Sequence, residues 1–206
     1  MFLSRQDAGI SLAQKLIQSK ILADIVIGLP RGGILVALEI SHKLKIPLDT
    51  LMVKKIGASF NQELAIGAIS LDNISYVDEV LISILGIDKK LVQYEITKQS
   101  KNLKKREKIL RSGKKSLVVK NKKVILTDDG VATGATVFAA ISWLRKHHAK
   151  KIILALPLAP QELIGKLQNQ VDLCIILETP VNFASVGQFY QDFKEVSDEE
   201  VIKILR

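Results

Sequence analysis

One stretch near the middle of the chain, VILTDDGVATGATVFAA at positions 124–140, constrains the fold more than any other. Its first four residues favour a short buried β-strand. Two carboxylates, Asp128 and Asp129, follow at once, and small residues then lead into Thr133-Gly134-Ala135-Thr136. The apolar residues beyond recur with the spacing of one helix face, at Val137, Ala140, Ile141 and Leu144. The stretch therefore predicts a strand, an acidic tip, a small-residue loop and a helix.

This arrangement has a definite chemistry. A loop of small and hydroxyl residues at a helix N-terminus presents free backbone N–H groups and the positive end of the helix dipole, and both attract phosphate. Two acids on the same loop can hold hydroxyl groups or a hydrated Mg²⁺. Phosphate, adjacent hydroxyls and a metal together describe a phosphorylated ribose. A generic strand-to-helix turn with an exposed Asp pair is the alternative, but it does not explain why all these features coincide.

The stretch resembles the 5-phosphoribosyl-1-diphosphate (PRPP) motif of the type I phosphoribosyltransferases: an apolar strand, two acids, two or three small residues and T-G-x-[ST]. The resemblance implies that Asp128 and Asp129 are catalytic and hold the ribose hydroxyls, directly or through Mg²⁺ bound with PRPP. It assigns the 5-phosphate to Ala132, Thr133, Gly134, Ala135 and Thr136.

A second glycine-rich junction lies upstream. The strand predicted at Asp24–Leu29 ends in Pro30-Arg31-Gly32-Gly33, and a helix resumes at Ile34. Paired glycines let a backbone approach a ligand closely, and an Arg fork suits phosphate oxygens. Alone, this pattern would also fit a sharp turn with an exposed Arg. Beside the first loop it resembles the pyrophosphate loop of the same family, which implies pyrophosphate binding by Arg31, Gly32 and Gly33.

A basic pair, Lys54-Lys55, follows an apolar segment predicted as a strand at Leu51–Val53. In the family, a strand with such an ending precedes a flexible loop that closes over the active site, and residues 57–63 occupy the corresponding place. The resemblance gives Lys54 and Lys55 a catalytic role in pyrophosphate departure, whereas a solvated lysine pair at a strand end is the alternative. A hairpin is predicted around Asp72-Asn73.

The net charge of +9 has a local origin. Lys98–Lys123 holds twelve basic residues and one acid, a balance of +11, which leaves about −2 for the remainder. This segment lies in a predicted basic helical insertion at about 86–115. A solvated helix face, a rim that steers a polyanionic substrate, and a nucleic-acid surface are three interpretations. The absence of aromatic residues from Lys98 to Lys123 disfavours the third.

Strands and helices alternate along most of the chain, which predicts an α/β domain with a mostly parallel sheet flanked by helices. Its ligand loops are expected to meet at the carboxyl ends of the strands. Residues 1–206 then form one phosphoribosyltransferase-like domain with a small hood, to which about 181–206 contribute. In the family a hood covers the acceptor, and Phe183 or Tyr190 could form a platform for a flat base, although core packing would explain either residue equally well.

Motifs along nearly the whole chain, including KxGAxxNxELAIGA and FAxVGxxYxDF, are similar to a bacterial subgroup of predicted phosphoribosyltransferases. The resemblance implies transfer of phosphoribose from PRPP to a small nitrogen acceptor, in nucleotide metabolism. In 6-oxopurine transferases an acid precedes the T-G, whereas Ala132 stands here, which disfavours hypoxanthine and guanine. The alternative is a regulatory protein that senses PRPP without turnover and binds RNA through the basic helix.

The remaining composition is that of a soluble globular protein. Hydrophobic residues make up 48%, and no apolar run has the length of a membrane span. The N-terminus lacks the pattern of a signal peptide, and the single Cys174 excludes an internal disulfide, so a cytoplasmic location is expected. No zinc-binding spacing of His and Cys is present. We also expect a homodimer.

Overall fold

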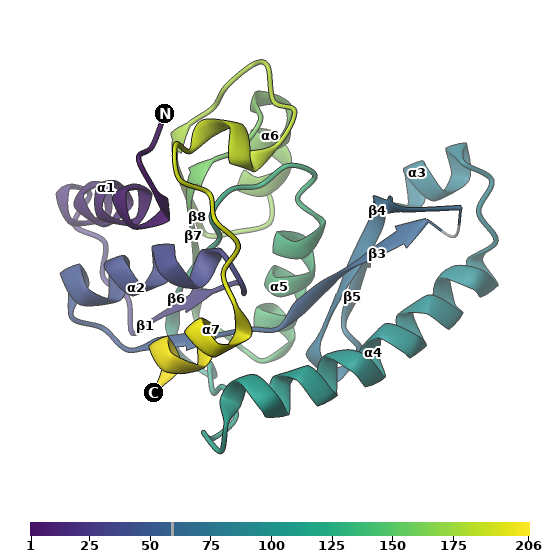
Figure 1. Ribbon diagram of the computed structural model, residues 1–206, viewed down its shortest axis with the longest axis horizontal. Coiled ribbons are helices and arrows are strands. Elements are labelled where there is room, and N and C mark those ends of the chain that lie inside the picture. The colour runs from purple at the N-terminus through teal and green to yellow at the C-terminus, as the bar shows by residue number, and fades with distance from the viewer. Residues whose placement is uncertain (59) are drawn as a thin grey trace.

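The computed structural model describes residues 1–58 and 60–206, without the side chains of residues 62 and 63. It consists of a five-stranded sheet covered by helices on both faces and a smaller three-stranded antiparallel sheet to one side, which we call the hood (Figure 1). The predicted fold class is confirmed. In chain order the elements are α1 Arg5–Gln18, β1 Ile25–Gly28, α2 Gly33–Leu44, β2 Leu48–Thr50, β3 Val53–Ala58, β4 Asn61–Ser70, β5 Ser75–Val77, α3 Glu79–Ile84, α4 Lys89–Arg111, β6 Lys123–Thr127, α5 Ala135–Lys146, β7 Lys151–Leu158, α6 Ile164–Gln168, β8 Leu173–Glu178 and α7 Asp198–Leu205.

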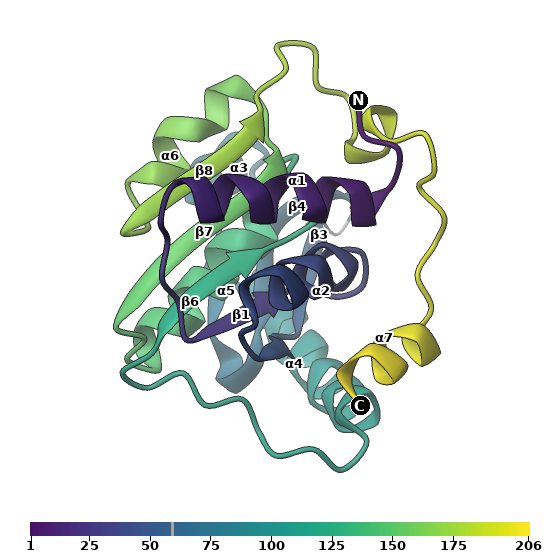
Figure 2. The same ribbon diagram turned by 90° about the vertical axis from the view of Figure 1, so that its left-hand side faces the viewer.

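The larger sheet has the strand order β2-β1-β6-β7-β8, and every neighbouring pair is parallel. The three central strands, β1, β6 and β7, are buried on both faces, which explains their continuous apolar sequences. Val26 and Ile125 pack on the side of α1 and α2, whereas Ile27 and Leu126 pack on the side of α5. Figure 2 shows α1 and α2 lying in front of the sheet, with α5 behind it. Because successive side chains of a strand point to opposite faces, the sheet has one apolar layer on each side.

The strand order reverses direction between β1 and β6. From β1 the chain crosses through α2 to β2 at one edge, and from β6 it crosses through α5 to β7 toward the other edge. The chain therefore continues from β1 and from β6 into helices that cover opposite faces of the sheet. Such a switch point is where ligands bind in open α/β sheets.

The hood contains β3, β4 and β5, with α4 against one face and α5 against the other. The hairpin predicted around Asp72-Asn73 is confirmed, because a 3₁₀ turn at Leu71–Asn73 joins β4 to β5. Asp72 and Asn73 both adopt the left-handed conformation, with φ of 58° and 59°. This turn holds the hood against the larger domain, since Asp72 accepts a hydrogen bond from Trp143 and Asn73 accepts one from Ser100.

The strand predicted at Leu51–Val53 is wrong. β2 ends at Thr50 in the parallel sheet, and β3 begins at Val53 in the hood. Lys54 and Lys55 consequently lie inside an antiparallel strand and do not end a parallel one. The closing loop predicted at 57–63 falls partly outside the described residues. Where described, its ends continue the hairpin, with Gly57 and Ala58 in β3 and Asn61 opening β4.

The C-terminal segment separates into two parts. Residues Ala184 to Gly187 and Phe193 reach the cleft described below. The tail helix α7 instead packs against α4, α2 and β2, and Figure 2 shows it at the opposite end of the molecule from the N-terminus. The assignment of about 181–206 to a hood stays a prediction. No helix in the described part of the chain combines the length and apolar character that crossing a membrane requires.

Candidate active site

Two loops meet at the switch point. β1 and β6 pair with Gly28 opposite Thr127, so the chain leaves both strands side by side. A methyl group added at Gly32 would lie 1.9 Å from Asp129 Oδ2, and one at Gly33 would lie 2.7 Å from Asp128 Oδ1. The predicted pyrophosphate loop thus lies directly against the acid pair. Only glycine permits this approach, because any Cβ would overlap a carboxylate. The Pro30–Arg31 peptide in this loop is cis.

Asp129 is held by an arginine from the start of the chain. Arg5 Nε lies 2.6 Å from Asp129 Oδ2, and both side chains are largely buried, with exposures of 9% and 15%. Arg5 also donates to the carbonyl of Lys194 and stacks over the Phe193 ring at 3.7 Å. The sequence analysis did not assign Arg5 to the site. No local signal marks it, since an arginine in the first turn of an amphipathic helix is ordinarily a surface residue.

The small-residue loop ends as predicted, at the N-terminus of α5. Gly134 caps this helix with φ of 81°, and its carbonyl accepts from Phe138 N. A side chain at Gly134 would be strained by this φ and would also meet Phe138. Ala132 and Thr133 are exposed. The amides that open α5 have no partner within the helix, so they can bind an anion.

A cleft of about 730 Å³ lies beside this loop. Its walls come from the hood, from the loop itself and from the segment before α7, and they include Lys55, Leu64, Asp78, Leu81, Ala132, Thr133, Val186 and Phe193. The volume falls in the range of small-molecule and cofactor sites. The cleft therefore unites three parts of the chain that are distant in sequence.

The two predicted lysines have different positions. Lys55 pairs with Ala68, which packs with Ala135 and Ala139 of α5, and Lys55 lines the cleft. Lys54 pairs with Ile69, which packs with Val92 and Ile96 of α4 on the other face of the hood. Alternation along β3 separates the two side chains. The structure brings Lys55 to the cleft, whereas Lys54 faces away from it.

The two predicted platform residues lie in an aromatic cluster. Tyr190 is only 6% exposed, its ring packs beside Phe2 and Phe193, and its hydroxyl donates to the Asp129 carbonyl. It is therefore part of the core that supports the acid pair, and a role as an open platform is corrected. Phe183 packs on Phe189 with ring centroids 5.1 Å apart. Among the aromatic residues of this cluster, Phe193 lines the cleft itself.

The predicted pyrophosphate arginine lies at the surface. Arg31 forms an ion pair with Glu195, whose side chain is 76% exposed. A pair this exposed is worth little energy, because water screens both charges. Arg31 can therefore exchange Glu195 for a more highly charged anion at small cost.

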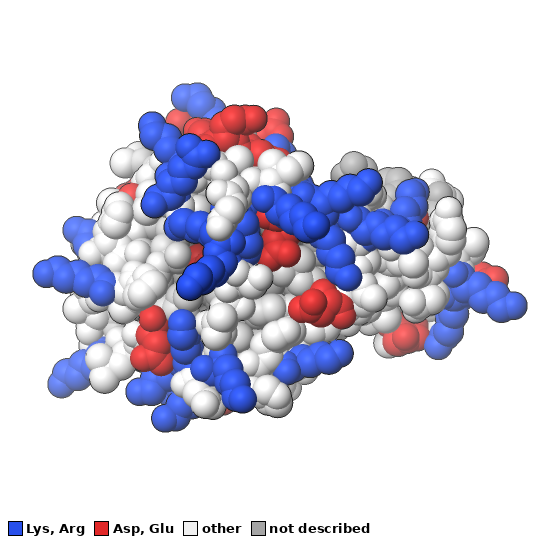
Figure 3. Space-filling view, turned by 90° about the horizontal axis from the view of Figure 1, so that it is seen from below, with Lys and Arg blue, Asp and Glu red and all other residues white. Residues whose placement is uncertain are grey.

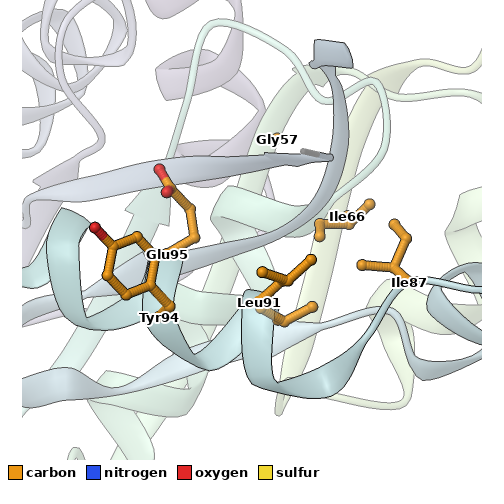
Figure 4. A pocket seen from close by; sticks show the side chains of 7 residues that line it. Gly57, Ile66, Ile87, Leu91, Tyr94 and Glu95 are labelled. Carbon is orange, nitrogen blue, oxygen red and sulfur yellow. The ribbon is translucent and has the colours of Figure 1, made fainter. Parts of the chain in front are cut away.

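A smaller cavity lies between the hood sheet and α4, and Figure 4 shows the side chains that line it. Its volume is about 240 Å³, and its lining includes Ile66, Ile87, Leu91, Tyr94 and Glu95. The aliphatic side chains dominate, and Glu95 supplies a single carboxylate among the lining side chains in the described part of the chain. Nothing in this cavity suits a phosphate.

Comparison with known proteins agrees with this geometry. Residues 4–192 match the model of the phosphoribosyl transferase domain. The chain belongs to this family. Two Mycobacterium tuberculosis proteins, named "Putative phosphoribosyl transferase" MT0597 and Rv0571c, are each 38% identical over the whole chain, which spans 46% of their length. The crystal structure of TT1426 from Thermus thermophilus is 35% identical, with a TM-score of 0.83 over 100% of this chain and 97% of that one.

The acid pair of this phosphoribosyl transferase domain fits a divalent cation that arrives with its substrate. No group of three or more metal-ligating side chains occurs in the described residues, so the protein supplies no complete cage. Asp128 and Asp129 offer two adjacent carboxylates instead. Magnesium typically takes one or two carboxylates together with substrate phosphates and water.

Burial raises the pKa of both carboxyls, and a neighbouring charge acts on one of them. The pKa of Asp128 is raised well above its ordinary value, first by burial and then by the charge of Asp129. Burial also raises the pKa of Asp129, although the hydrogen bond and charge of Arg5 oppose it. A cation bound at the pair would favour the ionised form of both acids.

These shifts predict a specific pH dependence of stability. Because the folded protein holds a proton on Asp128 more tightly than the unfolded chain, ionising Asp128 destabilises the fold as pH rises above its unfolded pKa. The Asp128→Asn variant keeps a side-chain oxygen that can accept the hydrogen bond from the Asp129 amide, and it removes the negative charge of Asp128. We expect the variant to have a higher free energy of unfolding than the wild type at pH 7, with a difference that shrinks toward pH 4. Urea denaturation across this range measures it, and an unchanged or lower stability at pH 7 would contradict the burial argument.

Proposed function

We propose that this chain transfers the 5-phosphoribosyl group of PRPP to a small nitrogen acceptor, releasing pyrophosphate, with Mg²⁺ bound alongside PRPP. The observation that carries the proposal is the contact between the acid pair and Gly32-Gly33 at the switch point. It supports a single site in which an anion loop, two carboxylates and a second anion loop meet. PRPP carries the matching groups in the same order: a 5-phosphate, ribose hydroxyls and a pyrophosphate.

Each part of PRPP has a matching partner in this arrangement. The amides and hydroxyls of Thr133 to Thr136 bind the 5-phosphate, and Asp128 and Asp129 hold the ribose 2- and 3-hydroxyls. Arg31 and the amides of Gly32 and Gly33 bind the pyrophosphate. Arg5 is a positioning residue, since it fixes the Asp129 carboxylate from behind and is itself fixed by Phe193 and Lys194.

The reaction breaks the bond between C1 and the pyrophosphate oxygen, and the electron pair leaves with pyrophosphate. C1 gains positive charge, and the acceptor nitrogen bonds to it from the opposite face and loses its proton. Asp128 and Asp129 stabilise that positive charge, an electrostatic role that a half-buried site strengthens. Lys55, on the cleft wall, stabilises the negative charge of the departing pyrophosphate. Mg²⁺ held with Asp128 and Asp129 would neutralise further charge on the same leaving group.

The cleft also restricts the acceptor. Leu64, Leu81 and Phe193 supply apolar surface suited to a flat ring, and Phe183 stands behind this wall in the aromatic cluster. Ala132 occupies the position at which the 6-oxopurine enzymes carry an acid. The acceptor must therefore bring a nitrogen that attacks without a base at that position, which favours adenine, pyrimidines or simple amines over hypoxanthine and guanine.

Pyrophosphate release tests the proposal. Purified protein with PRPP and Mg²⁺ is assayed against a panel of purines, pyrimidines and small amines. We expect release that depends on one acceptor and disappears in the Asp128→Asn/Asp129→Asn variant, because that variant loses both carboxylates. Release that persists in the folded double variant would contradict the assigned roles. PRPP binding without release from any acceptor would favour the sensing alternative.

The two adjacent lysines give a matched comparison. Lys55→Met removes the cation that lines the cleft, and we expect kcat/KM for pyrophosphate release to fall by roughly a hundredfold, as for other groups that stabilise developing negative charge. Lys54→Met removes the same charge from the opposite face of β3, and we expect a change of less than about threefold. Steady-state kinetics with the active acceptor measures both. Equal losses in the two variants would show that only the overall charge matters.

A further inference from the structure

A third cavity lies at the far end of α5 from the acid pair. Its volume is about 450 Å³, and it is bounded by α4, the turn at 71–73, the segment before β6 and the last turn of α5. Because α5 runs 12 residues at about 1.5 Å per residue, roughly 18 Å of helix separates this cavity from the small-residue loop. The two sites are therefore distinct.

The charged side chains around this cavity differ in their partners. Its two acids have internal donors: Asp72 accepts from Trp143 Nε1 at 3.0 Å, and Glu107 accepts from Arg111 Nε at 2.9 Å. Its two lysines, Lys104 and Lys108, are exposed, and neither forms an ion pair with any described residue. Two acids and two lysines give the lining no net formal charge, but only the lysines lack ion-pair or hydrogen-bond partners among the described residues. The two lysines are therefore free to bind an anion.

The two lysines are spaced for a single phosphate. Lys104 and Lys108 are four residues apart on α4, so their side chains leave the helix one turn apart on the same side. Ser116, across the cavity, adds an exposed hydroxyl. Two ammonium groups and a hydroxyl can share the oxygens of one phosphate group.

The remaining wall offers a flat aromatic surface. His147 stacks on Trp143 with ring centroids 3.7 Å apart, and its two ring nitrogens face the Trp143 carbonyl and the Asp72 carboxylate. These contacts fix the imidazole, which keeps 34% of its side-chain surface exposed. Leu71 and Leu117 form an apolar floor beside it. A planar heterocycle can stack here while its phosphate lies on the lysines.

We propose that this cavity binds a nucleotide unit, with its phosphate on Lys104 and Lys108 and its base against His147. The unit belongs either to a free nucleotide or to a single-stranded RNA. Lys101 and Lys105 extend the lysine row along α4 at the spacing of one helix face, outside the cavity. Figure 3 shows Lys and Arg side chains gathered over the face of the molecule that α4 occupies. Further phosphates of a strand would follow that row.

The chain carries a built-in reporter, because Trp143 in the cavity wall is its single tryptophan. Intrinsic fluorescence is titrated with AMP and, separately, with a short oligoadenylate RNA. We expect a saturable change with at least one of them. Lys104→Gln/Lys108→Gln should weaken binding by about tenfold or more, since two charged hydrogen bonds to phosphate are lost. Lys101→Gln/Lys105→Gln removes the same charge outside the cavity and should weaken AMP binding by less than about threefold.

The Lys101→Gln/Lys105→Gln variant distinguishes a free nucleotide from a single-stranded RNA as the ligand. If the ligand is a strand, Lys101→Gln/Lys105→Gln weakens RNA binding strongly and the affinity falls with salt; if it is a free nucleotide, AMP binds at least as tightly as RNA. The proposal would be overturned if neither AMP nor RNA produced a saturable change in fluorescence. It would also be overturned if both lysine double variants weakened AMP binding equally, or if Asp128→Asn/Asp129→Asn abolished the fluorescence change. The last would place the binding in the candidate active site.

Discussion

The rest of the site depends on the close packing of two adjacent carboxylates against two glycines. Both carboxyls lose hydration in this position, which raises both pKa values, and the charge of Asp129 raises the pKa of Asp128 further. The fold compensates on one side only. Arg5 neutralises Asp129, and Phe193 and the Lys194 carbonyl hold Arg5 in place. Asp128 has no such partner among the described residues, so the site keeps an unmet demand for positive charge that a substrate-bound cation would satisfy.

The topology of the sheet explains why these groups meet. β1 and β6 are parallel neighbours, so the loops that follow them begin side by side, and α2 and α5 then cover opposite faces. The hood is held beside α5 because the turn at Leu71–Asn73 is fixed to both α4 and α5. α5 is thus common to both parts of the molecule. Its N-terminus carries the small-residue loop, and its C-terminal end carries Trp143, which stacks with His147 at the third cavity.

Local patterns in the sequence predict much of this arrangement. The strand before Asp128, the helix after Gly134 and the hairpin at Asp72-Asn73 follow from residue periodicity and turn chemistry, which act over short distances. Lys54 and Lys55 show the limit, because no local signal tells which sheet a short apolar segment joins or which face each side chain takes. Arg5 and Tyr190 show another, since their roles arise from contacts with Asp129, more than a hundred residues from Arg5. Such contacts exist only once the domain has folded.

We propose that the acid pair and the two loops form one PRPP site, and equilibrium binding tests this without knowledge of the acceptor. Isothermal titration calorimetry of PRPP with Mg²⁺ is carried out on the wild type and on Gly32→Ala, whose added methyl group would displace the Asp129 carboxylate. We expect one binding site per chain in the wild type and an affinity about tenfold or more weaker in the variant. Absence of binding to the wild type, or equal affinity in a folded Gly32→Ala protein, would contradict it.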